Sequence, residues 1–228
     1  DKYFTWGRIP NDIMISKGIN NDKLKIVGAP WLDNFKFKLS KNVNNEKNVL
    51  IALSGAGHMT GLEEHKSNIE LLKEICGDNK DINFIFKIHV KDKIEYYTTN
   101  KGSFSYSNMN VISGHNNDKN IFDFLKKSFL LITTDSTAAI DAMIMRVPVL
   151  TFENDKFQRN SNEFIKFGAT YHAKNKSEIN SLVRKLHSKD FDHNVDLRSQ
   201  DFLNEYFANY SSRAVSYTHL TLPTNGEV

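Results

Sequence analysis

One stretch, residues 129–153, constrains the fold more than any other part of the chain. It opens with a short, continuous apolar and β-branched run, Phe129–Thr133, which is typical of a strand buried on both faces. The four polar residues 134–137 follow, and side chains of this kind cap the N-terminus of a helix. An almost wholly apolar helix is expected over 138–145, a proline ends it, and 149–152 predicts a second buried strand. The pattern indicates one parallel crossover unit with a polar elbow.

The elbow residues Asp135, Ser136 and Thr137 offer hydroxyls and free backbone N–H groups at the positive end of a helix. In a parallel sheet such an elbow lies at the carboxyl edge, where anions and especially phosphates bind. Asp141 follows Thr137 by one helical turn and projects from the same face, where ribose hydroxyls are a natural partner. In the alternative interpretation Ser136 and Asp135 only cap the helix, and Asp141 pairs with a nearby Lys or Arg. The stretch alone leaves both interpretations open.

The composition describes an ordinary globular protein and limits its partners only weakly. The 228 residues suffice for one full α/β domain and part of another. A net charge of +3 suits nucleotides or an anionic membrane face, and the absence of basic blocks argues against nucleic acid. Cys76 is the only cysteine, which excludes a disulfide framework and favours a reducing compartment such as the cytoplasm. Peripheral attachment to the inner face of the cell membrane is compatible with this charge, whereas no run of about eighteen apolar residues predicts a span.

Both ends of the chain depart from what a complete domain is expected to show. The chain opens without Met, and Tyr3–Gly7 reads as a strand running into a turn, so we expect an N-terminally truncated fragment. Residues 216–228 abandon the Lys- and Asn-rich composition of the rest and resemble read-through of a sequencing adapter. We therefore exclude them from the fold prediction, with a genuine edge strand as the alternative.

Strand-like and helical segments alternate regularly from residue 48 onward, which predicts a Rossmann-like, doubly wound parallel sheet of the α/β class. The predicted order is the end of a truncated Rossmann-like domain with an interdomain passage over 1–40, then a linker, a second Rossmann-like domain and a non-native tail. The last three segments are expected over 41–47, 48–215 and 216–228.

A glycine-containing loop directly follows the predicted strand 49–53 and includes Ser54, Gly55 and Gly57. Glycines at such a place let the backbone approach a ligand closely. The loop is no P-loop, because no Gly-Lys-Ser/Thr sequence follows it, and it is a poor dinucleotide fingerprint. A plain tight turn is the alternative.

A second candidate loop follows the predicted strand 83–90, before a helix expected over 92–99. The alternation of a strand puts Lys87 and His89 on one side, with His89 at the carboxyl end. A histidine there can hydrogen-bond a phosphate, a ribose or a base, or carry a proton. The alternative is a half-exposed histidine satisfied by a backbone carbonyl.

Charged residues also follow the second strand of the opening stretch. Glu153 and Arg159 would lie on the ligand side of the sheet, or they are ordinary surface charges. No cluster of His, Cys and carboxylates has the spacing of metal ligands, and no nucleophile elbow is present. The sequence therefore predicts neither a metal site nor a bound cofactor.

Three segments resemble the carboxyl half of GT-B-fold transferases, in particular CDP-glycerol glycerophosphotransferases and bacterial capsule and sialic-acid transferases. UDP-GlcNAc 2-epimerases are more distantly similar. The segments that carry this resemblance are residues 26–30 with Asp33, residues 87–89, and residues 132–137 with Asp141 and Pro148. The match as a whole extends over roughly residues 3–210. Val90 replaces the proline that usually follows the histidine, and Asp141 stands where many relatives have Glu.

The resemblance implies a donor-binding domain for a CDP-, CMP- or UDP-linked donor, used to build a cell-surface polysaccharide or teichoic-acid-like polymer. By carry-over, His89, Ser136 and Thr137 hold the nucleotide and its phosphates. The acceptor would be a carbohydrate or lipid-linked polymer, and the catalytic base would lie on the amino-terminal domain. A helix N-terminus with two hydroxyls can stabilise the departing phosphate without a metal. An epimerase-like enzyme and an inactive α/β binding domain are the competing interpretations.

Overall fold

The computed structural model describes residues 2–32, 48–57, 60–98, 106–114, 120–157, 162–188 and 197–208. The chain divides into two compact units, Asp1–Lys41 with Gln200–Val228, and Asn42–Ser199. The domain boundaries predicted from the sequence stay a prediction.

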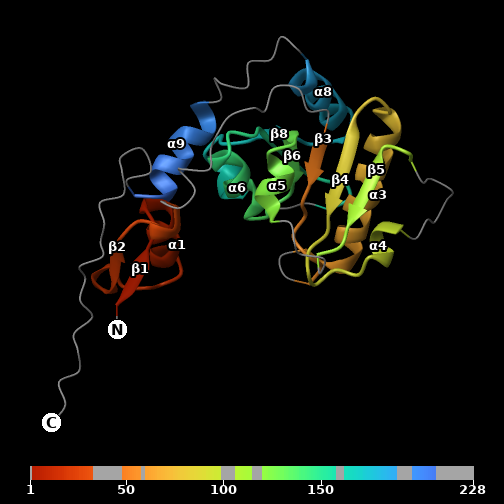
Figure 1. Ribbon diagram of the computed structural model, residues 1–228. Helices are drawn as coiled ribbons and strands as arrows, with labels where there is room; N and C mark the ends of the chain where they lie inside the picture. Colours follow the sequence, from red (N-terminus) through yellow and green to blue (C-terminus); the bar gives the residue numbers. More distant parts are fainter. Residues whose placement is uncertain are drawn as a thin grey trace. The chain divides into compact units, whose positions relative to one another are not determined.

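The larger unit alternates strands and helices along its described part (Figure 1). Its strands there are β3 (Asn48–Ile51), β4 (Asn83–Lys87), β5 (Met109–Ile112), β6 (Ser128–Thr133), β7 (Val149–Phe152) and β8 (Tyr171–Ala173). Its helices there are α3 (Leu62–Asp78), α4 (Glu95–Thr98), α5 (Ile121–Leu125), α6 (Ala138–Ile144), α7 (Glu163–Lys166) and α8 (Lys176–His187).

Within the described residues, the six strands form one sheet in the order β5-β4-β3-β6-β7-β8, and every neighbouring pair is parallel. The chain moves outward from β3 through β4 to β5, returns to β6 beside β3, and then moves outward in the other direction. This is the predicted doubly wound α/β arrangement. The strand order reverses between β3 and β6, and in such sheets the ligand crevice opens at that switch point, outside the carboxyl ends of the strands.

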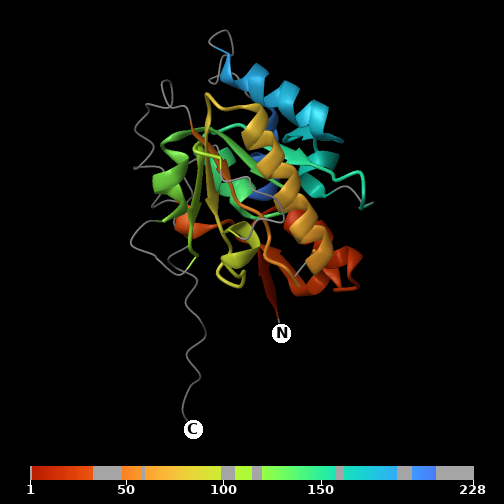
Figure 2. The same ribbon diagram turned by 90° about the vertical axis from the view of Figure 1, so that its right-hand side faces the viewer.

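Helices cover the sheet on both faces. On one face α3 and α8 pack side by side (Figure 2) and bury a core that includes Ile69 and Leu72 of α3 and Val183 of α8. Strand residues such as Leu130 point into the same core. Because side chains alternate along a strand, Leu131 points to the opposite face, and α5 and α6 pack against β6 and each other. All six residues of β6 are buried, as its continuous apolar run predicts.

The smaller unit contains a parallel pair of strands, β1 (Tyr3–Thr5) and β2 (Leu24–Ile26). Its helical elements in the described residues are α1 (Arg8–Ser16), the 3₁₀ turns Asn21–Lys23 and Pro30–Leu32, and most of α9 (Leu197–Tyr206). The ring of Trp6 packs against Phe207 with centroids 5.9 Å apart, and the Ala208 N–H donates to the Trp6 carbonyl. These contacts join residues 207–208 to the turn after β1, inside one unit.

Two predicted boundaries around the second candidate loop were wrong. Strand β4 ends at Lys87 instead of Val90, and α4 begins at Glu95 instead of Asp92. The residues between them form a turn in which the Asp92 N–H donates to the His89 carbonyl. His89 therefore lies in this turn, two residues beyond the strand. The carboxylate of Asp92 accepts a hydrogen bond from the Ala56 N–H, a contact that a regular helix start at this residue does not require.

Several predictions fall outside the described residues. Asp33 of the resemblance, the linker over 41–47, Arg159 and the tail over 216–228 all lie there. Among the helices that are described, none is long and apolar enough to cross a membrane.

Candidate functional site

The loops that follow β3, β4, β5 and β6 adjoin one another at the carboxyl edge of the sheet, beside the switch point. We call this group of loops the switch-point crevice, because ligands of such sheets bind there. The glycine loop, residues 54–57, and the elbow after β6 are joined directly across it. The Ser54 hydroxyl donates to Asp135 Oδ1 over 2.6 Å, although the two residues are 81 positions apart in the chain. The hydroxyl of Thr134 reaches the same oxygen at 3.0 Å. Two of the three candidate loops predicted from the sequence are therefore in contact.

The third candidate loop packs directly on the glycine loop. A Cβ placed on Gly55 would lie 2.5 Å from Nδ1 of His89, which is closer than any carbon can approach. The imidazole thus occupies the space that a side chain at position 55 would need. Gly57 closes the loop with its N–H donating to the Thr60 carbonyl at 2.9 Å. The absence of a side chain at Gly55 therefore leaves room for the His89 ring. A plain tight turn would not explain this packing.

A fourth loop belongs to the crevice and was missed from the sequence. Gly114 comes two residues after β5, and a Cβ there would lie 2.8 Å from both the Ile88 carbonyl oxygen and the Val90 nitrogen. The backbone after β5 therefore presses against the backbone on either side of His89. A glycine directly behind a predicted strand end was the available signal.

His89 is held in a defined orientation. Its Nδ1 accepts a hydrogen bond from the Lys91 N–H at 3.2 Å, so that in the neutral ring the proton lies on Nε2. No partner for Nε2 occurs among the described residues, and the side chain is half-buried. The predicted alternative, a histidine satisfied by a backbone carbonyl, differs from this arrangement, in which the backbone group is a donor. Lys87 is half-buried at the end of β4.

The elbow combines a helix cap with open polar groups. The Ser136 hydroxyl accepts a hydrogen bond from the Ala138 N–H at 3.3 Å, as the capping interpretation predicts. Thr137 is exposed, and its side chain makes no capping bond. The Asn162 side chain donates to the Thr134 carbonyl at 2.8 Å and braces the elbow from the start of α7. No pattern in the sequence predicts this brace, because Asn162 is also the cap residue of its own helix, α7.

Asp141 lies half-buried on α6, one turn after Thr137. Burial raises the pKa of its carboxyl group from 3.8 to about 6. The Lys or Arg partner of the alternative interpretation is absent from the described residues, and so is any hydrogen-bond donor to this carboxylate. A buried polar group without a partner is costly, so Asp141 is suited to receive hydroxyl donors from a ligand.

A buried triad, His65, Asp92 and Tyr97, lies behind the glycine loop. Asp92 Oδ1 accepts the Ala56 N–H at 2.9 Å. Its Oδ2 lies 3.0 Å from His65 Nε2 and 2.8 Å from the Tyr97 hydroxyl. Burial would raise the pKa of Asp92, but hydrogen bonds from His65, Ala56 and Tyr97 outweigh it and hold the pKa below its ordinary value. Burial, followed by the neighbouring carboxylate, raises the pKa of the Tyr97 phenol.

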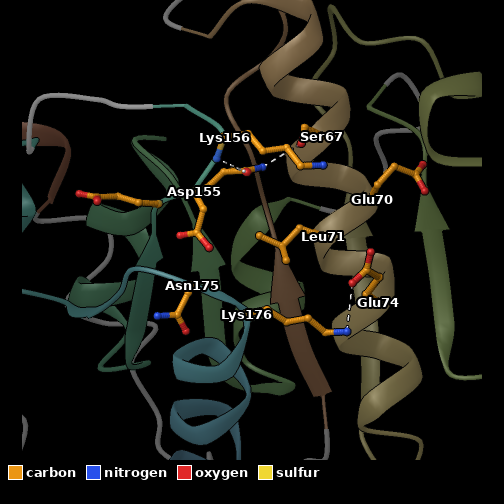
Figure 3. Close-up of a pocket in the computed structure, with 10 residues that line it drawn as sticks. Ser67, Glu70, Leu71, Glu74, Asp155, Lys156, Asn175 and Lys176 are labelled. Atoms are coloured by element: carbon orange, nitrogen blue, oxygen red, sulfur yellow. Dashed lines mark hydrogen bonds and ion pairs between the residues drawn. The ribbon is translucent and has the colours of Figure 1, made fainter.

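Glu153 lies apart from these groups. Its carboxylate is 3.3 Å from His172 Nε2, and it lines a different hollow of about 220 Å³ (Figure 3). That hollow lies between α3, the segment after β7 and the start of α8, and contains Leu71, Glu74 and Lys176 among others. The part of the chain that the structure describes contains no group of three or more His, Cys, Asp or Glu side chains that could hold a metal ion.

Comparisons with solved structures agree with this architecture. The chain is similar to the wall teichoic acid polymerase TagF, with 15% identity over 94% of this chain and 55% of that one and a TM-score of 0.55. It is also similar to the UDP-GlcNAc 2-epimerase of Methanocaldococcus jannaschii, solved with UDP-GlcNAc and UDP. The identity there is 18% over 88% of this chain and 59% of that one, with a TM-score of 0.56. The fold is GT-B-like.

A third similar structure, Staphylococcus aureus MnaA with UDP, has 14% identity over 94% of this chain and 56% of that one and a TM-score of 0.59. The resemblance predicted from the sequence is thus confirmed at the level of fold. Neither a protein-family model nor a curated protein matches the chain in sequence. The chain spans little more than half the length of these solved proteins.

Proposed function

We propose that the domain predicted over residues 48–215 binds the nucleotide of an activated donor, as part of a GT-B transferase that builds a cell-surface polysaccharide or teichoic-acid-like polymer. The observation that carries this proposal is the hydrogen bond between Ser54 and Asp135, which joins two predicted site loops at the switch point. Switch points of doubly wound sheets are where such folds bind nucleotides.

The polar groups of the crevice suit a nucleoside diphosphate. His89 presents Nε2–H as a donor, and the hydroxyls of Ser136 and Thr137 lie at the start of α6. These groups can hold the phosphates and stabilise the negative charge that develops on the departing nucleotide. Asp141 lies one turn further along α6, and its carboxylate, which has no partner among the described residues, can accept the ribose hydroxyls.

The donor is a cytidine or uridine nucleotide in this proposal. TagF has been solved as a variant soaked with CDPG, and the epimerase and MnaA were solved with UDP. Lys87 and Glu153 have at most a supporting role, since Glu153 lines the other hollow and pairs with His172. In this proposal the base that accepts the acceptor's proton belongs to the amino-terminal domain of the GT-B fold, outside the donor-binding domain.

Calorimetric titration of the folded protein with CDP, CMP and UDP tests the proposal. We expect one of the diphosphates to bind, and CMP to bind at least about tenfold more weakly than CDP because it lacks one phosphate that the elbow and His89 contact. Failure of all three to bind at millimolar concentration would refute the assignment.

A nucleotide-sugar 2-epimerase is the second candidate, favoured by the similarity to two UDP-bound structures, of which one is a UDP-GlcNAc 2-epimerase. Incubation of the full-length protein with UDP-GlcNAc alone separates the candidates. An epimerase isomerises the sugar without an acceptor, whereas the transferase leaves it unchanged. In an inactive binding domain, Ser136→Ala and Asp141→Ala would change stability but no ligand affinity.

A further inference from the structure

The His89 turn, residues 89–92, touches the glycine loop at both of its ends. At one end the His89 ring rests on Gly55, where a Cβ would lie 2.5 Å from Nδ1. At the other end Asp92 Oδ1 accepts the Ala56 N–H at 2.9 Å. The Asp92 N–H also donates to the His89 carbonyl at 2.9 Å, which closes the turn. The position of the imidazole is therefore tied to the position of the Asp92 carboxylate.

Two buried side chains, His65 and Tyr97, hold the Asp92 carboxylate in place through its other oxygen, Oδ2. His65 Nε2 and the Tyr97 hydroxyl both contact Oδ2, at 3.0 and 2.8 Å, and lie 3.3 Å from each other. His65 is 1% exposed and Tyr97 is 3% exposed, so neither can touch a ligand in the crevice. A buried polar network of this kind is costly unless it is fully satisfied, and here it rigidifies the loops that it joins.

We infer that His65 and Tyr97 are positioning residues for nucleotide binding, because they hold Asp92 and thereby set His89 and the glycine loop in their binding geometry. This inference rests on the proposed nucleotide function and adds to it two residues that lie on α3 and α4, outside the crevice. The consequence is specific: loss of one hydroxyl at position 97 changes the environment of an imidazole eight residues away, in a different element.

Tyr97→Phe is the decisive variant, because it removes a single oxygen atom and leaves the ring in the core. Tyr96→Phe is its matched control, since the neighbouring Tyr96 is half-buried and its hydroxyl has no partner among the described residues. Two quantities are measured on each folded protein: the imidazole ¹H and ¹⁵N resonances of His89, assigned with His89→Gln, and the Kd for UDP and CDP.

We expect Tyr97→Phe to shift the His89 resonances and to raise the Kd about three- to tenfold, the effect of losing one buried hydrogen bond. Tyr96→Phe should change neither quantity. His65→Gln serves as a second variant if Tyr97→Phe does not fold. Unchanged His89 resonances in a folded Tyr97→Phe or His65→Gln protein would overturn the inference, even if stability falls.

The resonance measurement needs no ligand, so it separates this inference from the proposed function. A wild-type protein that binds no nucleotide defeats the proposed function, and a shift of the His89 signals in that protein would still establish the coupling through Asp92. If the wild type and Tyr97→Phe bind nucleotide with the same Kd, the inference fails and the proposed function stands.

Discussion

The hydroxyl of Ser54 and the carboxylate of Asp135 form a 2.6 Å hydrogen bond between the loops that follow β3 and β6. The two strands are neighbours in the sheet, but their helices α3 and α6 leave toward opposite faces. Just beyond the end of β3, the Ala52 N–H donates to the Ile132 carbonyl, and the Thr133 hydroxyl donates to the Ala52 carbonyl at 2.6 Å. The bond between Ser54 and Asp135 extends this pairing into the two loops and helps to keep the two walls of the switch-point crevice in register.

Replacing Ser54 by Ala should weaken both the fold and the proposed site. We expect the free energy of unfolding to fall by about 1 kcal/mol, because Asp135 Oδ1 loses the hydrogen bond that the Ser54 hydroxyl donates. Urea unfolding measures this change, and titration with UDP and CDP measures the accompanying loss of affinity. Ser181→Ala, on the exposed surface of α8, is the control and should alter neither quantity. Wild-type stability in Ser54→Ala would contradict the role of this bond.

Gly55→Ala should displace the His89 ring, since the added Cβ would lie 2.5 Å from Nδ1. We expect about a tenfold rise in the Kd for nucleoside diphosphates, which titration calorimetry measures. Gly61→Ala is the matched control, because a Cβ at that glycine meets nothing within 4 Å. Equal affinities in the two variants would mean that the ring can move without loss.

Two substitutions of His89 separate the contributions that its two ring nitrogens make to nucleotide binding. Asn places an acceptor near the position of Nδ1 and keeps the bond from the Lys91 N–H, whereas Gln places a donor near the position of Nε2. If Nε2–H binds phosphate, His89→Asn loses about tenfold or more in affinity for CDP or UDP, and His89→Gln loses less. The reverse order would show that the turn, and not the donor, governs binding.

Asp141 should make the protein less stable as the pH rises. Its pKa is about 6 in the fold and near 3.8 when unfolded, so the folded state holds the proton more tightly. The contribution of Asp141 to the free energy of unfolding is fully present below about pH 4 and is lost as the pH rises through about 6. This loss amounts to at most about 3 kcal/mol.

Asp141→Asn removes this titration, so its unfolding free energy should exceed that of wild type at pH 7 and lack the decline between pH 4 and 6. Urea unfolding across this range is the measurement, with exposed Asp155→Asn as control. The same Asp141→Asn protein should bind nucleotide more weakly if the carboxylate receives the ribose. If Asp141→Asn gains stability and keeps its affinity for nucleotide, the Asp141 carboxylate is buried but has no role in nucleotide binding.

Patterns in short stretches of the sequence predicted the elements whose structure depends mainly on neighbouring residues. The apolar run before Thr134 identified β6, and the polar residues after it identified the elbow, because burial on two faces and helix capping both leave a short-range signature. The end of β4 was misplaced, since alternation of side chains continues through Ile88 and His89 while the backbone has already turned.

The buried triad had no such signature. His65 sits among amphipathic positions of α3, and Asp92 and Tyr97 read as the start of an ordinary helix. What brings them together is parallel pairing between β3 and β4, a contact between segments more than thirty residues apart (register Asn48 with Asn83). Gly114 was overlooked because the backbone that it accommodates, on either side of His89, follows a different strand.

The separation of 81 positions between Ser54 and Asp135 also fixes when in folding the crevice can exist. The two walls come together only when β3 and β6 have paired, and that pairing closes the longest loop in the central part of the sheet. Closing such a loop is slow compared with forming a helix or a hairpin. During synthesis on the ribosome, the glycine loop and the His89 turn can come together through β3 and β4 before β6 has emerged. The proposed nucleotide site would therefore be complete only once the two halves of the sheet have joined.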